Sequence, residues 1–144
     1  MTEATDTEGT TIELSTRIAA PPEVVWRYWT EPERMCEWWG VAADLDPKPG
    51  GACRVTMGQG PTMIGEYVEL VPHKRLVFTL GWDMAMPNGD AVPPGSTRVE
   101  VLLEPDGPET VLTLRHTGLP EGAVGDHTAG WGHFLAALAG AAGA

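Results

Sequence analysis

Residues 21–40, PPEVVWRYWTEPERMCEWWG, hold four of the six tryptophans in this chain of 144 residues. Tryptophan carries more apolar area than any other side chain, together with one N–H donor. The stretch begins with two prolines and ends in glycine, which are signals for the start and the end of a helix. It predicts a helix over residues 21–30 and a second, short helix over residues 31–39 with Thr30 as its N-cap. So many tryptophans indicate either a dense local core or an aromatic wall around a pocket.

Seven stretches outside this block predict β-strands, because apolar and polar residues alternate in them. Turn-rich segments such as GQGP and PDGPE join the later stretches, which is typical of an antiparallel meander. The segment over residues 83–96 is the one long loop. The expected strands cover residues 10–19, 42–46, 52–57, 63–71, 75–82, 97–104 and 110–117.

The final stretch, residues 122–142, predicts a long helix with one apolar face. Strand, two short helices, a run of strands and a long helix then follow one another along the chain. This segregated order indicates an α+β domain with a helix packed on an antiparallel sheet. The apolar face carries Trp131, Phe134, Leu135 and Leu138.

Length and charge limit the classes of protein to consider. A chain of this size predicts one domain, over residues 10–144, after a disordered tail at residues 1–9. The formal net charge is −11, and the few cationic residues are scattered. Since no basic patch is present to neutralise phosphates, we expect neither nucleic acid nor a membrane surface as a partner.

The two cysteines, Cys36 and Cys53, have neither metal-ligand spacing nor the number that a disulfide scaffold needs. We expect both to be buried free thiols in a cytoplasmic protein. No apolar run is long enough to span a membrane, and the polar, acidic start of the chain lacks the features of a signal peptide.

A series of short motifs runs through nearly the whole chain. In order, they are Ala20-Pro21, Val25-Trp26, Glu37-Trp38-Trp39-Gly40, Pro49-Gly50-Gly51, Gly65-Glu66-Tyr67, PHKRLVF at residues 72–78, residues 96–101, TVLTLRH at residues 110–116, and Gly130-Trp131. In this order and spacing they resemble the activator of heat-shock-protein-90 ATPase homologue family, within the START-like (SRPBCC) superfamily. The resemblance implies a helix-grip fold, in which a curved antiparallel sheet wraps around the long C-terminal helix. It also implies a cavity between them for a lipid, polyketide or other apolar small molecule.

Strand alternation proposes a lining for that cavity. Trp39 is expected to enter it rather than Trp38, because neighbouring residues on a helix diverge. Trp26 and Trp29 are expected on the flank of their helix or at the rim. Ordinary core packing is the alternative for every apolar member. The expected ligand-binding set is Trp39, Met57, Met63, Tyr67, Phe78, Leu80, Trp82, Val99, Val101, Leu112, Leu114, His116, Trp131 and Leu135, and Cys53, Val55 and Leu103 also point inward.

His116 is the one candidate for acid–base chemistry, since it continues the inward alternation of Leu112 and Leu114. The alternative is a histidine satisfied by protein partners. His127 and His133 do not share a helix face well, and with His116 they form no metal set. There is also no phosphate loop or dinucleotide fingerprint. We therefore expect neither a metal nor a cofactor.

Three functions fit these features. The first is binding of an apolar or aromatic small molecule, in secondary metabolism or self-resistance. The second is a cyclase- or dehydratase-like enzyme that uses the same cavity. The third is a co-chaperone that stimulates a heat-shock ATPase, as the family name suggests; such activators carry an additional N-terminal domain, whereas only nine residues precede the first expected strand. The sequence leaves a homodimer open.

Overall fold

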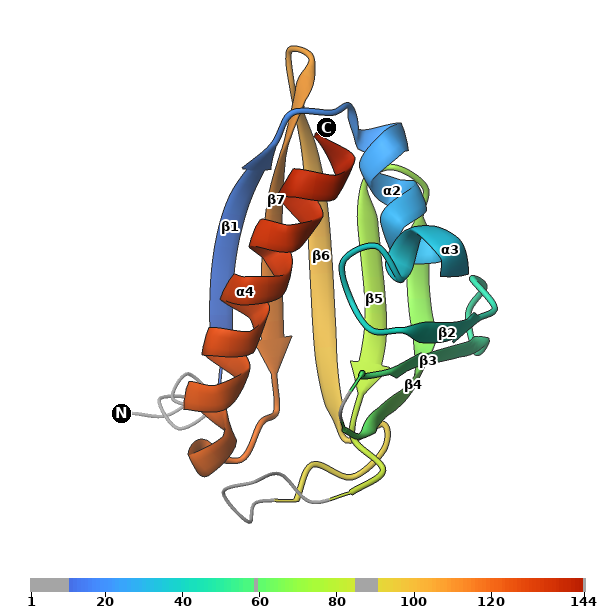
Figure 1. Cartoon of the computed structure of the whole chain (residues 1–144), viewed down its shortest axis with the longest axis vertical. Helices are drawn as coiled ribbons and strands as arrows, with labels where there is room; N and C mark the ends of the chain where they lie inside the picture. The colour runs from blue at the N-terminus through green and yellow to red at the C-terminus, as the bar shows by residue number, and fades with distance from the viewer. Residues whose placement is uncertain (1–10, 59, 85–90, 144) are drawn as a thin grey trace.

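A computed structural model describes residues 11–58, 60–84 and 91–143. Within these residues, seven antiparallel strands form one curved sheet in the order β1-β7-β6-β5-β4-β3-β2 (Figure 1). The expected tail at residues 1–9 and part of the long loop lie outside the described residues. The strands are β1 (Ile12–Ile18), β2 (Ala42–Leu45), β3 (Ala52–Thr56), β4 (Thr62–Val71), β5 (Arg75–Leu80), β6 (Thr97–Asp106) and β7 (Glu109–Thr117).

All helices lie on one face of the sheet (Figure 1). The long helix α4 (Val124–Ala142) follows a 3₁₀ turn, η1 (Glu121–Ala123), and crosses β1, β7 and β6. The short helices α2 (Pro22–Thr30) and α3 (Pro32–Met35) cover the neighbouring part of the sheet. The expected α+β helix-grip arrangement is confirmed. No helix in the described ranges is long and apolar enough to cross a membrane.

Cross-strand pairing explains why the inward residues meet. One row of paired residues runs across five strands, because each pair in an antiparallel ladder points to the same face. All five side chains of this row are buried, so the alternation in the sequence correctly identified the concave face. The row consists of Tyr67, Phe78, Val99, His116 and Ile12.

The second short helix is the main departure from expectation. It ends at Met35, and residues 36–38 form a turn that is followed by a bend at residue 39. Thr30 does not cap it, since its hydroxyl donates to the carbonyl of Trp26. The rings of Trp38 and Trp39 therefore do not diverge as on a helix; they stack with centroids 5.5 Å apart.

The strand expected to reach Trp82 ends two residues earlier, at Leu80. Gly81 passes so close to a neighbouring segment that an added Cβ would lie 1.8 Å from the Pro93 carbonyl oxygen. The backbone N–H of Trp82 then donates a hydrogen bond to the carbonyl of Val92, and Trp82 forms an isolated antiparallel β-bridge with Met63. This turn of the chain directs the Trp82 side chain toward α4, as its hydrogen bond to that helix shows.

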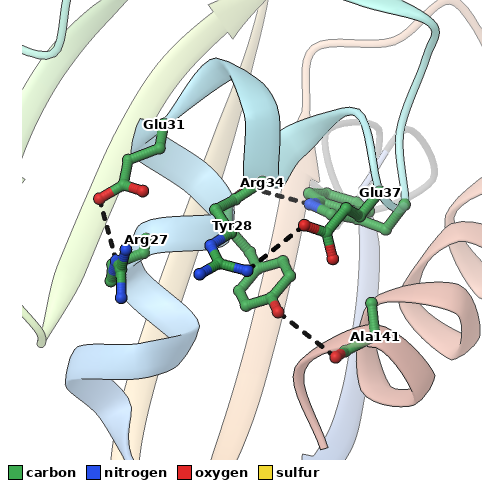
Figure 2. A network of polar contacts seen from close by, with 7 residues as sticks. Arg27, Tyr28, Glu31, Arg34, Glu37 and Ala141 are labelled. Atoms are coloured by element: carbon green, nitrogen blue, oxygen red, sulfur yellow. Dashed lines mark hydrogen bonds and ion pairs between the residues drawn. The ribbon is translucent and has the colours of Figure 1, made fainter. Parts of the chain in front are cut away.

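Side-chain hydrogen bonds attach the tryptophan-rich block to the rest of the fold. The Trp38 indole donates to the carbonyl of Tyr28, and the Tyr28 hydroxyl donates to the carbonyl of Ala141 in the last turn of α4 (Figure 2). The Tyr67 hydroxyl on β4 donates to the carbonyl of Trp29. The block thus fixes the end of α4 and one edge of the core at once.

Candidate functional site

A cavity of about 130 Å³ lies between α4 and the end of β5. Four of its lining residues, Trp39, Leu80, Trp82 and Trp131, belong to the set expected from the sequence. The turn after α3, the end of β5 and three turns of α4 each supply part of its wall. The complete lining is Trp39, Leu80, Trp82, Asp126, His127, Gly130, Trp131 and Phe134.

Most of the other expected residues lie in the packed core rather than in the wall of this cavity. Strand alternation gives the direction of a side chain but not whether the space in front of it is filled. Met57 is partly buried and lies in a separate groove. The buried residues of the expected set are Met63, Tyr67, Phe78, Val99, Val101, Leu112, Leu114, His116 and Leu135.

Two tryptophans of the cavity wall pack against each other and against Trp29 in the core. The ring of Trp39 lies 5.1 Å from that of Trp131, and Trp29 lies 6.4 Å from Trp131, between ring centroids. Trp29 was expected at a helix flank or the rim, but it is 1% exposed and central in the core. Trp26 alone fits that expectation, partly buried with its ring against His73. This packing fixes the orientation of the two tryptophans that reach the cavity.

His116 lies behind the cavity in a fully satisfied hydrogen-bond chain. The Trp131 indole donates to Nδ1 of His116 at 3.0 Å, and Nε2 lies 2.8 Å from the Thr97 hydroxyl. Since that hydroxyl donates its own proton to the Leu80 carbonyl, Nε2 must carry the ring proton. Burial, with a smaller contribution from His127, lowers the pKa of His116 to about 3. The histidine is neutral, with both nitrogens occupied.

The expected set lacked four lining residues, namely Asp126, Gly130, Phe134 and His127, and His127 is the one that bonds to another lining residue. Its Nδ1 lies 2.8 Å from the Ala123 carbonyl, and its Nε2 accepts a hydrogen bond from the Trp82 indole at 3.0 Å. Nδ1 therefore carries the proton in this arrangement. The signal was present in the sequence, because His127 precedes Trp131 by four residues and so shares its helix face. Pairing His127 with His133, which lies on a different face of the helix, hides this relation to Trp131.

Charge at the cavity is negative. Asp126 lies at its rim, is exposed, and occupies the first turn of α4. None of the lining residues is a lysine or an arginine. The cavity is therefore an aromatic space with a carboxylate at its entrance.

A more open groove of about 350 Å³ also borders α4. Phe134 lines both the groove and the cavity, so the two spaces share this side chain. Trp38 lines the groove, whereas its neighbour Trp39 lines the cavity. The remaining groove residues are Cys36, Glu37, Gly40, Val41, Met57, Gly58 and Ala137.

Neither cysteine is poised for chemistry. Cys53 is buried, and burial raises the pKa of its thiol to about 12. Cys36 was expected to be buried but is half-buried in the groove, and its thiol pKa is raised by burial and by Glu33. Both thiols are protonated at neutral pH, and protonated thiols are poor nucleophiles and metal ligands. Among the described residues, no group of three or more His, Cys, Asp or Glu side chains could hold a metal ion.

Comparison with known proteins gives a consistent picture. The family model described as "Activator of Hsp90 ATPase homolog 1-like protein" matches residues 19–143. None of the curated proteins matches the chain.

Three solved structures illustrate the similarity. The AHSA1-like protein RHE_CH02687 of Rhizobium etli is 35% identical, with a TM-score of 0.72 over 92% of this chain and 81% of its own. MLL2253 of Mesorhizobium loti is 26% identical, with a TM-score of 0.78 over 91% and 95%. DynU16, a protein of the dynemicin biosynthetic locus, is 26% identical, with a TM-score of 0.75 over 90% of this chain and 46% of its own.

Proposed function

The chain belongs to the activator of Hsp90 ATPase homologue 1-like family, and on that premise we propose that it binds an apolar or aromatic small molecule between its sheet and α4. The observation that carries this proposal is the cavity of about 130 Å³ with Trp39, Trp82 and Trp131 in its wall. Concave, mostly apolar sites with a few polar groups are the usual form of small-molecule sites.

The size of the cavity limits the part of the ligand that it encloses. An engineered apolar cavity of about 150 Å³ binds benzene, so the present space suits one ring or a group of similar volume. A longer ligand would extend toward the groove beyond Phe134. The likeness to DynU16, from a biosynthetic locus, supports a role in secondary metabolism or self-resistance.

Binding is favoured over turnover by the state of the two histidines. An acid–base catalyst needs a nitrogen that can reach the substrate. Both nitrogens of His116 and both of His127 are already engaged with protein groups. A cyclase- or dehydratase-like activity would first have to break one of these hydrogen bonds.

Gly130 offers a sharp test, because it lines the cavity and an added Cβ would contact nothing within 4 Å. The variant Gly130→Leu should fill the cavity without removing any existing contact. Gly132→Leu is the matched control, since Gly132 is also helical with free space around it but lies outside the lining. Tryptophan fluorescence and thermal shift against a panel of aromatic and polyketide-like compounds provide the readout.

We expect some panel members to raise the melting temperature of the wild type and of Gly132→Leu but not of Gly130→Leu. An equal response in Gly130→Leu would place the ligand elsewhere. No response from any protein across the panel would refute the binding proposal.

The family description favours one second candidate, a co-chaperone that stimulates the ATPase of an Hsp90-type chaperone. It predicts that the purified chain raises the steady-state ATP hydrolysis rate of such a chaperone. Gly130→Leu separates the two functions, because filling the cavity should leave a surface-mediated stimulation intact. An unchanged hydrolysis rate at saturating concentration would remove this candidate.

A further inference from the structure

We propose that the group held in the cavity is cationic, namely a fully alkylated ammonium such as a trimethylammonium head. This inference rests on the binding function proposed above and names the class of ligand. It is carried by three features together: the aromatic side chains of the wall, indole and imidazole nitrogens that already bond to protein groups, and a carboxylate in the lining.

The aromatic walls suit a cation. Trp39, Trp82, Trp131 and Phe134 line a single small space. The face of an aromatic ring carries negative potential, and tryptophan attracts cations most strongly. Several such rings around one space form the aromatic cage that binds quaternary ammonium groups in proteins. A trimethylammonium head has fewer heavy atoms than benzene, so its volume is compatible with about 130 Å³.

The nitrogens around Trp82 and Trp131 are already engaged, which disfavours an anion or a ligand rich in hydrogen bonds at that part of the wall. The indole N–H groups of Trp82 and Trp131 donate to His127 and His116. The remaining nitrogens of these histidines face Ala123 and Thr97. Because a fully alkylated ammonium has no N–H to donate, it needs no acceptor from these engaged nitrogens when it leaves water.

The local charge also favours a cation. The N-terminus of a helix carries roughly half a positive charge, which alone would repel one. Asp126 lies in that first turn and lines the cavity, and its carboxylate opposes the helix contribution. The net charge of −11 adds a long-range field of the same sign.

Calorimetric titration with choline, and with its uncharged analogue in which tert-butyl replaces trimethylammonium, tests the proposal. The two molecules have almost the same shape and differ in charge. We expect the wild type to bind choline at least about threefold more tightly, from the cation–π preference. Asp126→Asn should weaken choline binding about two- to fivefold and leave the neutral analogue unchanged.

Two further variants complete the design. Glu33→Gln removes one exposed charge outside the cavity lining and should leave both affinities at the wild-type value. Trp82→Leu keeps an apolar wall but removes one ring face, so choline should lose more affinity than the neutral analogue.

The outcomes separate this inference from the function on which it rests. Equal or tighter binding of the neutral analogue would overturn the cationic ligand class while supporting a cavity for apolar molecules. Absence of choline binding would overturn it as well. Failure of every compound, including the aromatic panel above, would refute the binding function itself.

Discussion

His116 is a polar residue with 0% exposure in the core of this protein. His116 sits in a row of apolar side chains, where a charge would be expensive. Its two hydrogen bonds fix one neutral tautomer and link β7 to α4 through Trp131. His116 therefore holds Trp131, and with it part of the cavity wall, in position.

The pH dependence of stability follows from this state. The pKa of His116 is lowered to about 3 in the folded protein, against an ordinary value of 6.5. Below pH 6.5, His116 takes up a proton in the unfolded chain but not in the folded protein. The free energy of unfolding therefore falls as the pH falls toward 3. Above pH 6.5 the contribution is complete. The expected loss from this group is about 1.4 kcal/mol per pH unit.

Urea denaturation between pH 6.5 and 4 measures this loss. Many carboxylates titrate in the same window, so the comparison between variants is decisive. His116→Gln, which cannot gain a charge, should show a shallower slope of unfolding free energy against pH than the wild type. The exposed control His133→Gln should keep the wild-type slope. Identical slopes for all three proteins would show that His116 charges freely in the fold.

At the scale of elements, α4 contains several glycines that its packing does not require. An added Cβ at Gly125, Gly130, Gly132 or Gly140 would contact nothing within 4 Å. Glycine in a helix interior costs about 1 kcal/mol relative to alanine. The helix is therefore held by tertiary contacts rather than by its own propensity.

Replacing Gly132 and Gly140 together with alanine should raise the unfolding free energy by about 1–2 kcal/mol, measured by urea denaturation. The contrasting variant is Gly65→Ala on β4, where the Cβ would lie 1.8 Å from the Thr79 carbonyl oxygen. That change should cost at least about 3 kcal/mol, because backbone must move. A destabilised helix variant would show that these glycines serve a contact not visible in the fold.

The sequence predicted the presence of the helices and strands better than the residues at which they end. Alternation placed every long strand, since one face of each strand is buried. The short helix predicted through Trp39 was wrong beyond Met35, because a local helix signal does not reveal where the chain must turn into β2. Similarly, the contact of Gly81 with Pro93 is tertiary and has no local signature.

In the molecule as a whole, the cavity and the groove both border α4 and share one lining side chain. The cavity of about 130 Å³ and the groove of about 350 Å³ share Phe134. Since Phe134 is only partly buried, its removal should be tolerated. Under the proposed binding function, we expect this side chain to limit the length of ligand that the cavity takes.

Phe134→Ala should join the two spaces and extend the ligands that produce a thermal shift from single-ring to two-ring compounds. The loss of a partly buried ring should lower the unfolding free energy by about 1–2 kcal/mol. Phe134→Leu is the matched control, which keeps the spaces separate. If both variants accept the same ligands as the wild type, the ring does not limit ligand size.

The candidate site could be predicted only in part, for a physical reason. Trp39, Trp82 and Trp131 were expected to face the ligand space, and all three line the cavity. Whether an inward side chain meets a hollow or another side chain depends on how the layers fit together, which alternation does not encode. His127 and Phe134 belong to the cavity because of where α4 crosses the sheet.

The attachments of α4 are unequal along its length. Its last turn accepts a hydrogen bond from Tyr28 through the carbonyl of Ala141 (Figure 2), and Leu135 and Leu138 are buried in the core. In its first turn, His127 accepts a hydrogen bond from the Trp82 indole. We expect the backbone amides of the first turn of α4 to exchange with solvent faster than those near Leu135 and Leu138, which hydrogen exchange would measure. Because Asp126 and His127 of that turn line the cavity, a ligand would enter beside the part of the helix that opens most readily.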